Sequence, residues 1–379
     1  MRFTDEHKQF ADAIRDLCAR ECGTREQRIA LTEGGTIANS RELLAKLADL
    51  GWLGVSVPEA YGGAGAGMVE ECIFLEETSR GLAPIRGYST AMTAGATYLR
   101  WGTEEQKRET MGGVCRGRLE SIALSEPGAG SDLGGVRCRA RRENGEYVID
   151  GQKTWISEAH LADHMLALVR TDSSGSKHQG LTLLQVPTDA SGIEMRGIET
   201  IEDLHVVNDV FFTDCRVPVA NVVGEPENAW QQLMRGLAIE RLIIAAMSTG
   251  AARRSLEDVI AYVKEREQFG RTLGRFQAVR HKIADLATEV ACCRSLVYDI
   301  AEAIDPGEED QLSTESSMAK LKCTSVAKAT ALEAMQLMGG YGVAVEYGME
   351  EQVRAALAPP IYGGSNEIQR EIIGKNLGL

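Results

Sequence analysis

Apolar residues recur every three or four positions in the first third of the chain, which is the pattern of helices that bury one face. The run from Asp5 to Cys22 has this spacing, and Ser40 is a suitable N-cap for a helix from Arg41 to Leu50. Thr103 begins a capping box that opens a further helix. We therefore expect an α-helical domain over residues 1–118.

Short runs of β-favouring residues replace this pattern between residues 119 and 226. Several runs alternate apolar and polar side chains, as half-buried antiparallel strands do. Asn144-Gly145, which lies between two of them, is a strong hairpin signal. We expect a small β-barrel or sandwich. The predicted strands are Ser121–Ser125, Val136–Arg142, Tyr147–Asp150, Met165–Arg170, Leu181–Val186 and Val206–Thr213.

Long amphipathic helices with short connections follow over residues 227–379, an arrangement typical of a helical bundle. The order of helices, strands and helices indicates an α+β multidomain protein with separate layers rather than a parallel α/β sheet. An acidic turn is expected at Asp305–Asp310. The predicted helices are Trp230–Arg266, Phe276–Ile304, Ser313–Met338, Glu346–Leu357 and Ser365–Gly374.

The composition of the 379-residue chain narrows the class of protein. Its net charge of −14 argues against nucleic acid as a partner. The nine cysteines lack metal-ligand spacing, so we expect reduced thiols and no metal. The N-terminus has no apolar signal core, and no apolar run approaches the ~20 residues that span a bilayer. We therefore expect a soluble, cytoplasmic protein that does not bind membranes.

Glu240 stands out on the helix predicted at Trp230–Arg266. A carboxylate on an apolar helix face is costly unless it is paired or used, and burial raises its pKa. Two readings follow. Glu240 is either neutralised by a cation such as the adjacent Arg241 or serves as a functional acid or base. The apolar residues at helical spacing from Glu240 are Leu233, Gly236, Leu237, Ile243 and Ile244.

Five other stretches combine residue types that suit a flat, anionic ligand. Small residues after a strand let the backbone approach a ring, and a Gly-rich loop that opens a helix offers free N–H groups. Taken singly, each stretch also fits a plain turn, a core tryptophan or a helix cap. The stretches are Ile122–Asp132, Lys153–Ser157, Arg266–Gly270, Gln336–Gly342 and Ile361–Arg370.

Together and in this order, these motifs resemble the acyl-CoA dehydrogenase family of flavoproteins. The resemblance covers almost the whole chain, and Ser125–Asp132, Arg266–Gly270 and Gln336–Gly342 are its most specific parts. It implies an N-terminal α-helical domain, a middle β-barrel domain and a C-terminal four-helix bundle. FAD is expected between the β domain and the bundle, and members of the family are usually homotetramers.

The resemblance also implies which residues contact FAD. The first group lies in the middle domain, where the tryptophan and the serine that follows it face the isoalloxazine ring. A second group reaches the FAD of a neighbouring subunit, and a third contacts the cofactor from the same chain. The groups are Leu124, Ser125, Gly130, Ser131, Trp155 and Ser157, then Arg266, Phe269, Gln336 and Gly340, and finally Ser365 and Glu367.

One position departs from the commonest pattern of the family. Many members read Tyr-Glu-Gly-Thr in the last loop and use that Glu as the base, but this chain has Gly363 there. The isovaleryl and long-chain branches carry their base on the bundle helix in a Glu-Arg pair, which Glu240-Arg241 resembles. The resemblance therefore implies Glu240 as the base, with the Gly363 N–H bonding the thioester oxygen. Substrate contacts are expected from Ser131, Arg241, Tyr362 and Gly363.

The activity that the resemblance implies is α,β-dehydrogenation of an acyl-CoA to a trans-2-enoyl-CoA, as in fatty acid β-oxidation. Electrons are expected to pass from FAD to an electron-transferring flavoprotein. We also expect the missing side chain at Gly363 to leave space for a branched acyl group. Four alternatives remain open: a dehydrogenase for carrier-protein-bound acyl groups, a non-catalytic subunit of a heteromeric enzyme, a flavin oxidase, and the DNA-associated branch. The last requires a basic C-terminal region, which is absent here.

Overall fold

The structure is a computed structural model that describes residues 3–304 and 312–379, so the predicted acidic turn at Asp305–Asp310 lies outside the described residues. The chain packs into two compact units. The first contains residues 1–28, 67–83 and 238–379, and the second contains residues 29–66 and 84–237. Within the described residues, no helix combines the length and the apolar character that crossing a bilayer requires.

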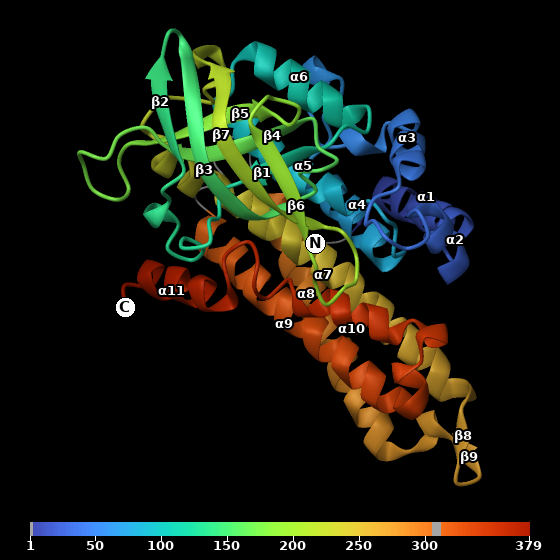
Figure 1. The fold of residues 1–379 in the computed structure, drawn as a ribbon. Coiled ribbons are helices and arrows are strands. Elements are labelled where there is room, and N and C mark those ends of the chain that lie inside the picture. The colour runs from blue at the N-terminus through green and yellow to red at the C-terminus, as the bar shows by residue number, and fades with distance from the viewer. Residues whose placement is uncertain (1–2, 305–311) are drawn as a thin grey trace. The chain divides into compact units, whose positions relative to one another are not determined.

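The second unit is organised on one seven-stranded sheet with the order β1-β4-β2-β3-β7-β6, in which β5 pairs with β4 (Figure 1). Strands β3 and β7 form its longest antiparallel pair, whereas β1 pairs with β4 in parallel. The strands are β1 (Glu120–Ala123), β2 (Arg139–Glu143), β3 (Glu146–Ser157), β4 (His164–Arg170), β5 (Leu181–Pro187), β6 (Ile193–Ile198) and β7 (Val207–Pro218).

Helices α3 (Arg41–Asp49), α5 (Arg86–Trp101) and α6 (Glu104–Cys115) belong to the same unit. The predicted N-caps are present: the Ser40 hydroxyl accepts from the Leu43 N–H, and Thr103 forms its capping box. Tyr98 of α5 is fully buried in a cluster with apolar residues of β4 and β5. This burial holds α5 against the sheet.

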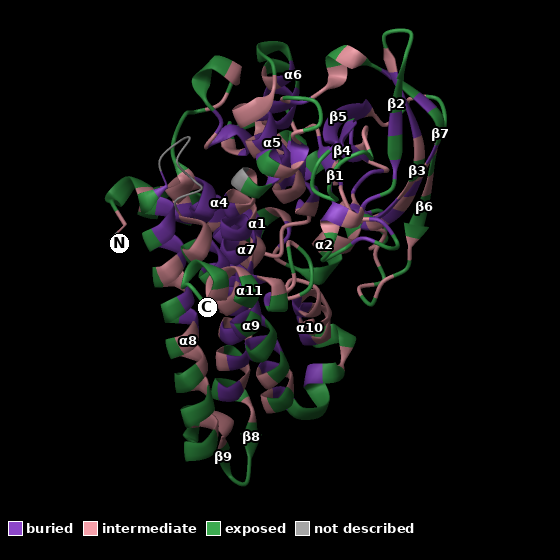
Figure 2. Cartoon of the chain, turned by 90° about the vertical axis from the view of Figure 1, so that its left-hand side faces the viewer, coloured by how far each residue is buried: buried purple, intermediate pink, exposed green. Residues whose placement is uncertain are grey.

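The first unit is built from long helices (Figure 1). Helix α9 contacts α8, α10 and α11, so it is the central element of the bundle. Its buried residues recur along its length, whereas α8 presents a largely exposed face (Figure 2). The elements are α1 (Asp5–Glu21), α2 (Arg25–Leu31, which continues into the second unit), α4 (Met68–Arg80), α7 (Ala229–Glu265, which enters from the second unit), α8 (Gln277–Ala303), α9 (Ser313–Met338), α10 (Met349–Leu357) and α11 (Asn366–Asn376).

Two buried carboxylates tie the helices of the first unit together. Glu77 of α4 accepts from Arg15 at 2.7 and 2.8 Å and from Arg253 at 2.8 Å. Glu76 pairs with Arg253 and with Arg294 of α8. Each carboxylate is almost fully buried, and each is compensated by at least one guanidinium. These groups are therefore structural, in contrast to the carboxylate described next.

Candidate active site

Glu240 lies on α7 in the first unit and is partly buried. Within the residues that the structure describes, its carboxylate has neither a hydrogen bond nor an ion pair. Burial raises the pKa of Glu240, and the positive charges of Arg241 and Lys320 act against this increase. A desolvated carboxylate without a direct partner is suited to accept a proton near neutral pH.

Arg241 does not neutralise its neighbour through a direct contact. Its guanidinium is almost fully buried and donates to the Ser313 hydroxyl at 3.1 Å, at the start of α9. Burial lowers the pKa of Arg241, while the charge of Glu240 acts to raise it. No Glu240–Arg241 ion pair within 4.0 Å is found in the described part of the chain. The alternative reading, in which Arg241 neutralises Glu240 through an ion pair, is therefore not supported by a contact between the two side chains.

The turn at Gly363 and Gly364 meets the helix face that carries Glu240. Both glycines have a left-handed backbone conformation, with φ of +63° and +76°. A Cβ at position 363 would lie 3.7 Å from Glu240 Oε1 and 2.3 Å from Ile244 Cδ1. The Glu240 carboxylate thus lies beside the loop position at which many family members carry their base. The expectation that Gly363 leaves space for a branched acyl group stays a prediction, and Ile244 occupies the place that a Cβ at this position would take.

Hydrogen bonds from two side chains hold this turn. Gln369 Nε2 donates to the carbonyl oxygens of Gly363 at 3.1 Å and Gly364 at 2.9 Å. Lys320 Nζ also donates to the Gly364 oxygen at 2.9 Å. The Gly363 N–H, in contrast, donates to no acceptor within the described residues. It is therefore available to a substrate oxygen, and Tyr362, 47% exposed, precedes it.

Substitution of Gly363 by Ala is expected to destabilise the turn by about 2–4 kcal/mol, because a left-handed backbone and a clash with Ile244 add together. Gly348 is a matched control, since its φ is +68° but a Cβ there would meet no atom within 4 Å. Gly348→Ala should cost only about 1 kcal/mol. Denaturant unfolding of both variants measures the difference, and equal losses would show that Ile244 does not confine the turn.

In the second unit, a buried ion pair shapes the loop that contains Leu124 and Ser125. Lys153 is fully buried, and its Nζ donates to the Leu124 carbonyl at 2.9 Å and to Glu126 Oε1 at 2.8 Å. The Glu126 carboxylate also accepts from two backbone N–H groups. The Thr154 N–H donates to the Ser125 carbonyl at 3.0 Å. Lys153 and Glu126 both lie inside the sequence motifs described above, but neither is among the residues expected to be functional.

Beside this loop, β3 presents a large aromatic surface. Trp155 is 60% exposed and left-handed, with φ of +62°, at an irregularity in the pairing of β3 with β7. The Ser121 hydroxyl donates to the Ser157 carbonyl at 2.5 Å, which fixes the end of the strand. A Cβ added at Gly130 would meet no atom within 4 Å. Together, an exposed indole and accessible glycine backbone fit a flat ring such as isoalloxazine. Leu124 and Ser125 are partly buried and Ser131 is exposed.

At the far end of α7, Arg266 lies over the Tyr341 ring at 5.1 Å. Both residues line a pocket of about 450 Å³, together with Gly340. Phe269, in the turn between β8 (Glu267–Gln268) and β9 (Arg271–Thr272), is 92% exposed and left-handed. The structure therefore brings Arg266 and Gly340 together, whereas Gln336 is not among the residues that line this pocket.

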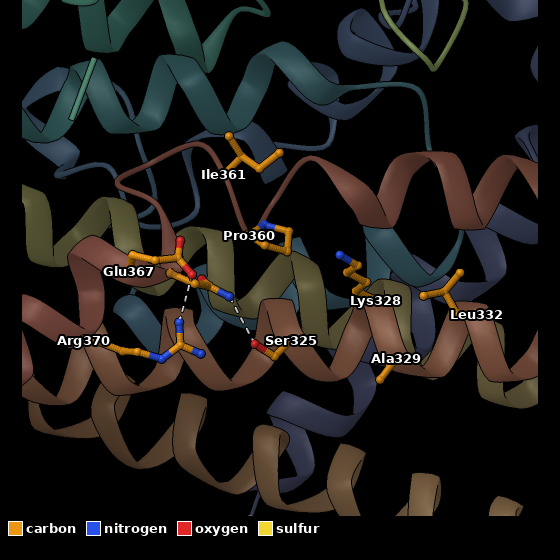
Figure 3. A pocket seen from close by; sticks show the side chains of 9 residues that line it. Ser325, Lys328, Ala329, Leu332, Pro360, Ile361, Glu367 and Arg370 are labelled. Atoms are coloured by element: carbon orange, nitrogen blue, oxygen red, sulfur yellow. Dashed lines mark hydrogen bonds and ion pairs between the residues drawn. The ribbon is translucent and has the colours of Figure 1, made fainter. Parts of the chain in front are cut away.

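A second pocket, of about 390 Å³, lies between α9 and the start of α11 (Figure 3). Glu367, which lines it, pairs with Arg370 at 3.1 Å, and both side chains are exposed. Ser365 is the N-cap of α11, as predicted, and accepts from the Ile368 N–H. Asn366 also lines the pocket, and its side-chain amide donates to the Ser325 hydroxyl.

The chain matches three family models along its length. Residues 4–118 match the N-terminal domain of acyl-CoA dehydrogenases, residues 121–215 the middle domain, and residues 228–378 the C-terminal domain. A 3-(aryl)acrylate reductase of Clostridium sporogenes is 32% identical, with all of both chains covered. A mitochondrial isovaleryl-CoA dehydrogenase of Solanum tuberosum is 32% identical, covering 99% of this chain and 91% of that protein.

The crystal structure of an acyl-CoA dehydrogenase from Geobacillus kaustophilus superposes with a TM-score of 0.92 at 32% identity. The match covers all of this chain and 99% of that one. The expected order of an N-terminal helical domain, a middle β domain and a C-terminal helical domain is confirmed. The chain therefore belongs to the acyl-CoA dehydrogenase family, and it is an oxidoreductase that acts on CH–CH bonds.

Proposed function

We propose that Glu240 removes the α-proton of an acyl-CoA thioester, which begins α,β-dehydrogenation to a trans-2-enoyl-CoA. The observation that carries the proposal is the environment of the carboxylate. It is partly buried, lies beside Gly363, and has no hydrogen bond or ion pair within the described residues. Burial raises the pKa of this carboxyl group, so its carboxylate form is weakly solvated and is a stronger base toward a weak carbon acid.

The Gly363 N–H is the proposed donor to the thioester oxygen. Negative charge develops on that oxygen as the α-proton leaves, and a fixed N–H donor stabilises it. Gln369 holds the carbonyls of Gly363 and Gly364, which belong to the two peptide groups that follow this N–H, so the turn that presents the N–H is fixed. We assign Arg241, Tyr362 and Ser131 to contacts with the substrate.

We propose FAD as the cofactor. When bound, FAD supplies the acceptor for the hydride that leaves the β-carbon. The exposed indole of Trp155 and the open backbone at Gly130 support this assignment. In a homotetramer, Arg266, Phe269, Gln336 and Gly340 would contact the cofactor of a neighbouring subunit. The proposed contacts within the chain are Leu124, Ser125, Gly130, Ser131, Trp155, Ser157, Ser365 and Glu367.

The physiological electron acceptor in this proposal is an electron-transferring flavoprotein, and the reaction would belong to fatty acid β-oxidation. Anaerobic titration of the flavin-loaded protein with a panel of acyl-CoA thioesters tests the activity. Loss of flavin absorbance with at least one saturated thioester is the expected result. Matched thioesters on a carrier protein separate the two substrate classes. If neither CoA thioesters nor carrier-protein thioesters bleach the flavin, the chain would instead be a non-catalytic subunit.

The raised pKa of Glu240 makes a prediction about stability and pH. A carboxyl group whose folded-state pKa is raised costs stability once it is ionised, and this cost disappears as the pH falls below its unfolded-state pKa. Glu240→Gln should therefore raise the melting temperature of the flavin-free protein at pH 8 but change it little at pH 4. A difference of equal size at both pH values would mean that the carboxyl group is not desolvated.

A further inference from the structure

Lys320 is a fully buried lysine on α9 that the mechanism above does not use. Its Nζ donates to the Gly364 carbonyl at 2.9 Å and to Asn366 Oδ1 at 3.3 Å. Burying an ammonium group is costly, and such groups are retained where a specific interaction compensates for the lost hydration. Lys320 is therefore expected to provide an interaction that an apolar side chain could not provide.

Hydrogen bonding alone does not account for this lysine, because each of its acceptors has a second donor. The Gly364 oxygen also accepts from Gln369 Nε2 at 2.9 Å. Asn366 Oδ1 also accepts from the Thr324 hydroxyl at 3.1 Å. Removing the ammonium would leave neither oxygen without a partner. What Lys320 supplies beyond these hydrogen bonds is a positive charge.

The charged groups around Lys320 come from two other helices. Glu240 and Arg241 face it from α7, and Glu367 faces it from α11. Burial lowers the pKa of Lys320 to about 8, while Glu240 and Glu367 act to raise it. Burial raises the pKa of Glu240, and the charge of Arg241, followed by that of Lys320, acts to lower it. The ammonium and the Glu240 carboxylate are not in direct contact, so this effect acts through space.

We propose that Lys320 is a positioning residue of the reaction, whose charge keeps Glu240 ionised while its hydrogen bond holds the Gly363–Gly364 turn. This inference rests on the proposed role of Glu240 and extends it to α9. Its ammonium group donates to the Gly364 carbonyl of the turn that presents the Gly363 N–H, so its charge also favours negative charge on the substrate oxygen. One side chain thereby supports both the base and the oxygen contact.

Two neutral substitutions separate the charge from the hydrogen bond. Lys320→Met removes both, and Lys320→Gln keeps an amide donor without charge. Gln369→Leu removes the other donor to the same turn and changes no charge. Lys322→Met is the matched control on α9, since Lys322 forms an ion pair with Glu289 and both side chains are more than 40% exposed.

The measurement is the rate of flavin reduction by a saturated acyl-CoA as a function of pH. Both Lys320 variants should move the acid limb of the profile to higher pH by about one unit, because Glu240 loses a stabilising cation. At pH values below the acid limb, this lowers the rate by about tenfold. Gln369→Leu should lower the plateau rate without moving the limb, and Lys322→Met should change neither.

An acid limb that stays in place in Lys320→Gln would overturn the inference, whatever happens to the plateau. Lys320→Arg retains the charge, so its limb should coincide with that of the wild type, and a shifted limb would also count against a role for charge. The proposed function has a separate test. If Glu240→Gln is inactive while the Lys320 variants keep the wild-type limb, only the inference about Lys320 fails.

Discussion

Glu240→Gln is expected to reduce the rate of flavin reduction by about 10³–10⁴-fold, because the amide has no basic oxygen for the α-proton. The substitution preserves the size of the side chain and removes a charge that is costly to desolvate. Bound flavin should therefore be retained at the wild-type ratio. Stopped-flow absorbance under anaerobic conditions, with an acyl-CoA that reduces the wild type, measures the rate.

Glu257→Gln is the control for this experiment. Glu257 lies on the same helix, is 41% exposed and pairs with Arg80 and, at 3.9 Å, with Arg253, so its replacement removes partly exposed ion pairs away from Glu240. Such a pair contributes about 0–1 kcal/mol to stability, and no change in rate is expected. If Glu240→Gln were reduced at the wild-type rate, another group would be the base.

Lys153→Met is expected to destabilise the protein by about 3–5 kcal/mol, because it leaves the Glu126 carboxylate buried without its cation. The same loss should free the Leu124–Ser125 loop, so that the variant releases flavin on dialysis. Denaturant unfolding and the flavin absorbance of the dialysed protein measure the two effects. Lys177→Met is the control, because Lys177 pairs with Asp132 close to the same loop while both side chains are exposed.

The double variant Lys153→Met/Glu126→Gln tests whether the two residues act as a pair. With both charges removed, the loss of stability should be smaller than for Lys153→Met alone, since no unpaired charge stays buried. The two backbone donors to Glu126 can still bond to the amide oxygen of Gln. Additive losses would show that the loop does not depend on the ion pair.

The long helices could be predicted from the chain, because their buried faces repeat at a fixed spacing. Helix α9 has the predicted bounds of Ser313–Met338, and the caps at Ser40, Thr103 and Ser365 are present. Strand β6 is absent from the predicted strands. It lies at the edge of the sheet with little burial, so its residues carry no strong apolar alternation.

Residues of the site could be predicted only where they stand out in a local sequence pattern. Glu240 was prominent because a carboxylate on an apolar helix face is unusual. The role of Ile244 depends on a turn that is more than 100 residues away in the chain, which no local pattern reveals. Lys320 and Lys153 are buried through contacts with distant backbone carbonyls, and a lysine within a helix or a strand gives no sign of such contacts.

Exchange of the α-proton is the most direct test of the base, because it isolates proton removal from hydride transfer. A 3-thiaacyl-CoA has sulfur in place of the β-carbon and so has no β-hydrogen to lose. In deuterated buffer, the flavin-loaded wild type should catalyse incorporation of deuterium at its α-carbon, measured by mass spectrometry. Glu240→Gln should incorporate none above the rate without protein. Incorporation by Glu240→Gln at the wild-type rate would contradict the role of Glu240.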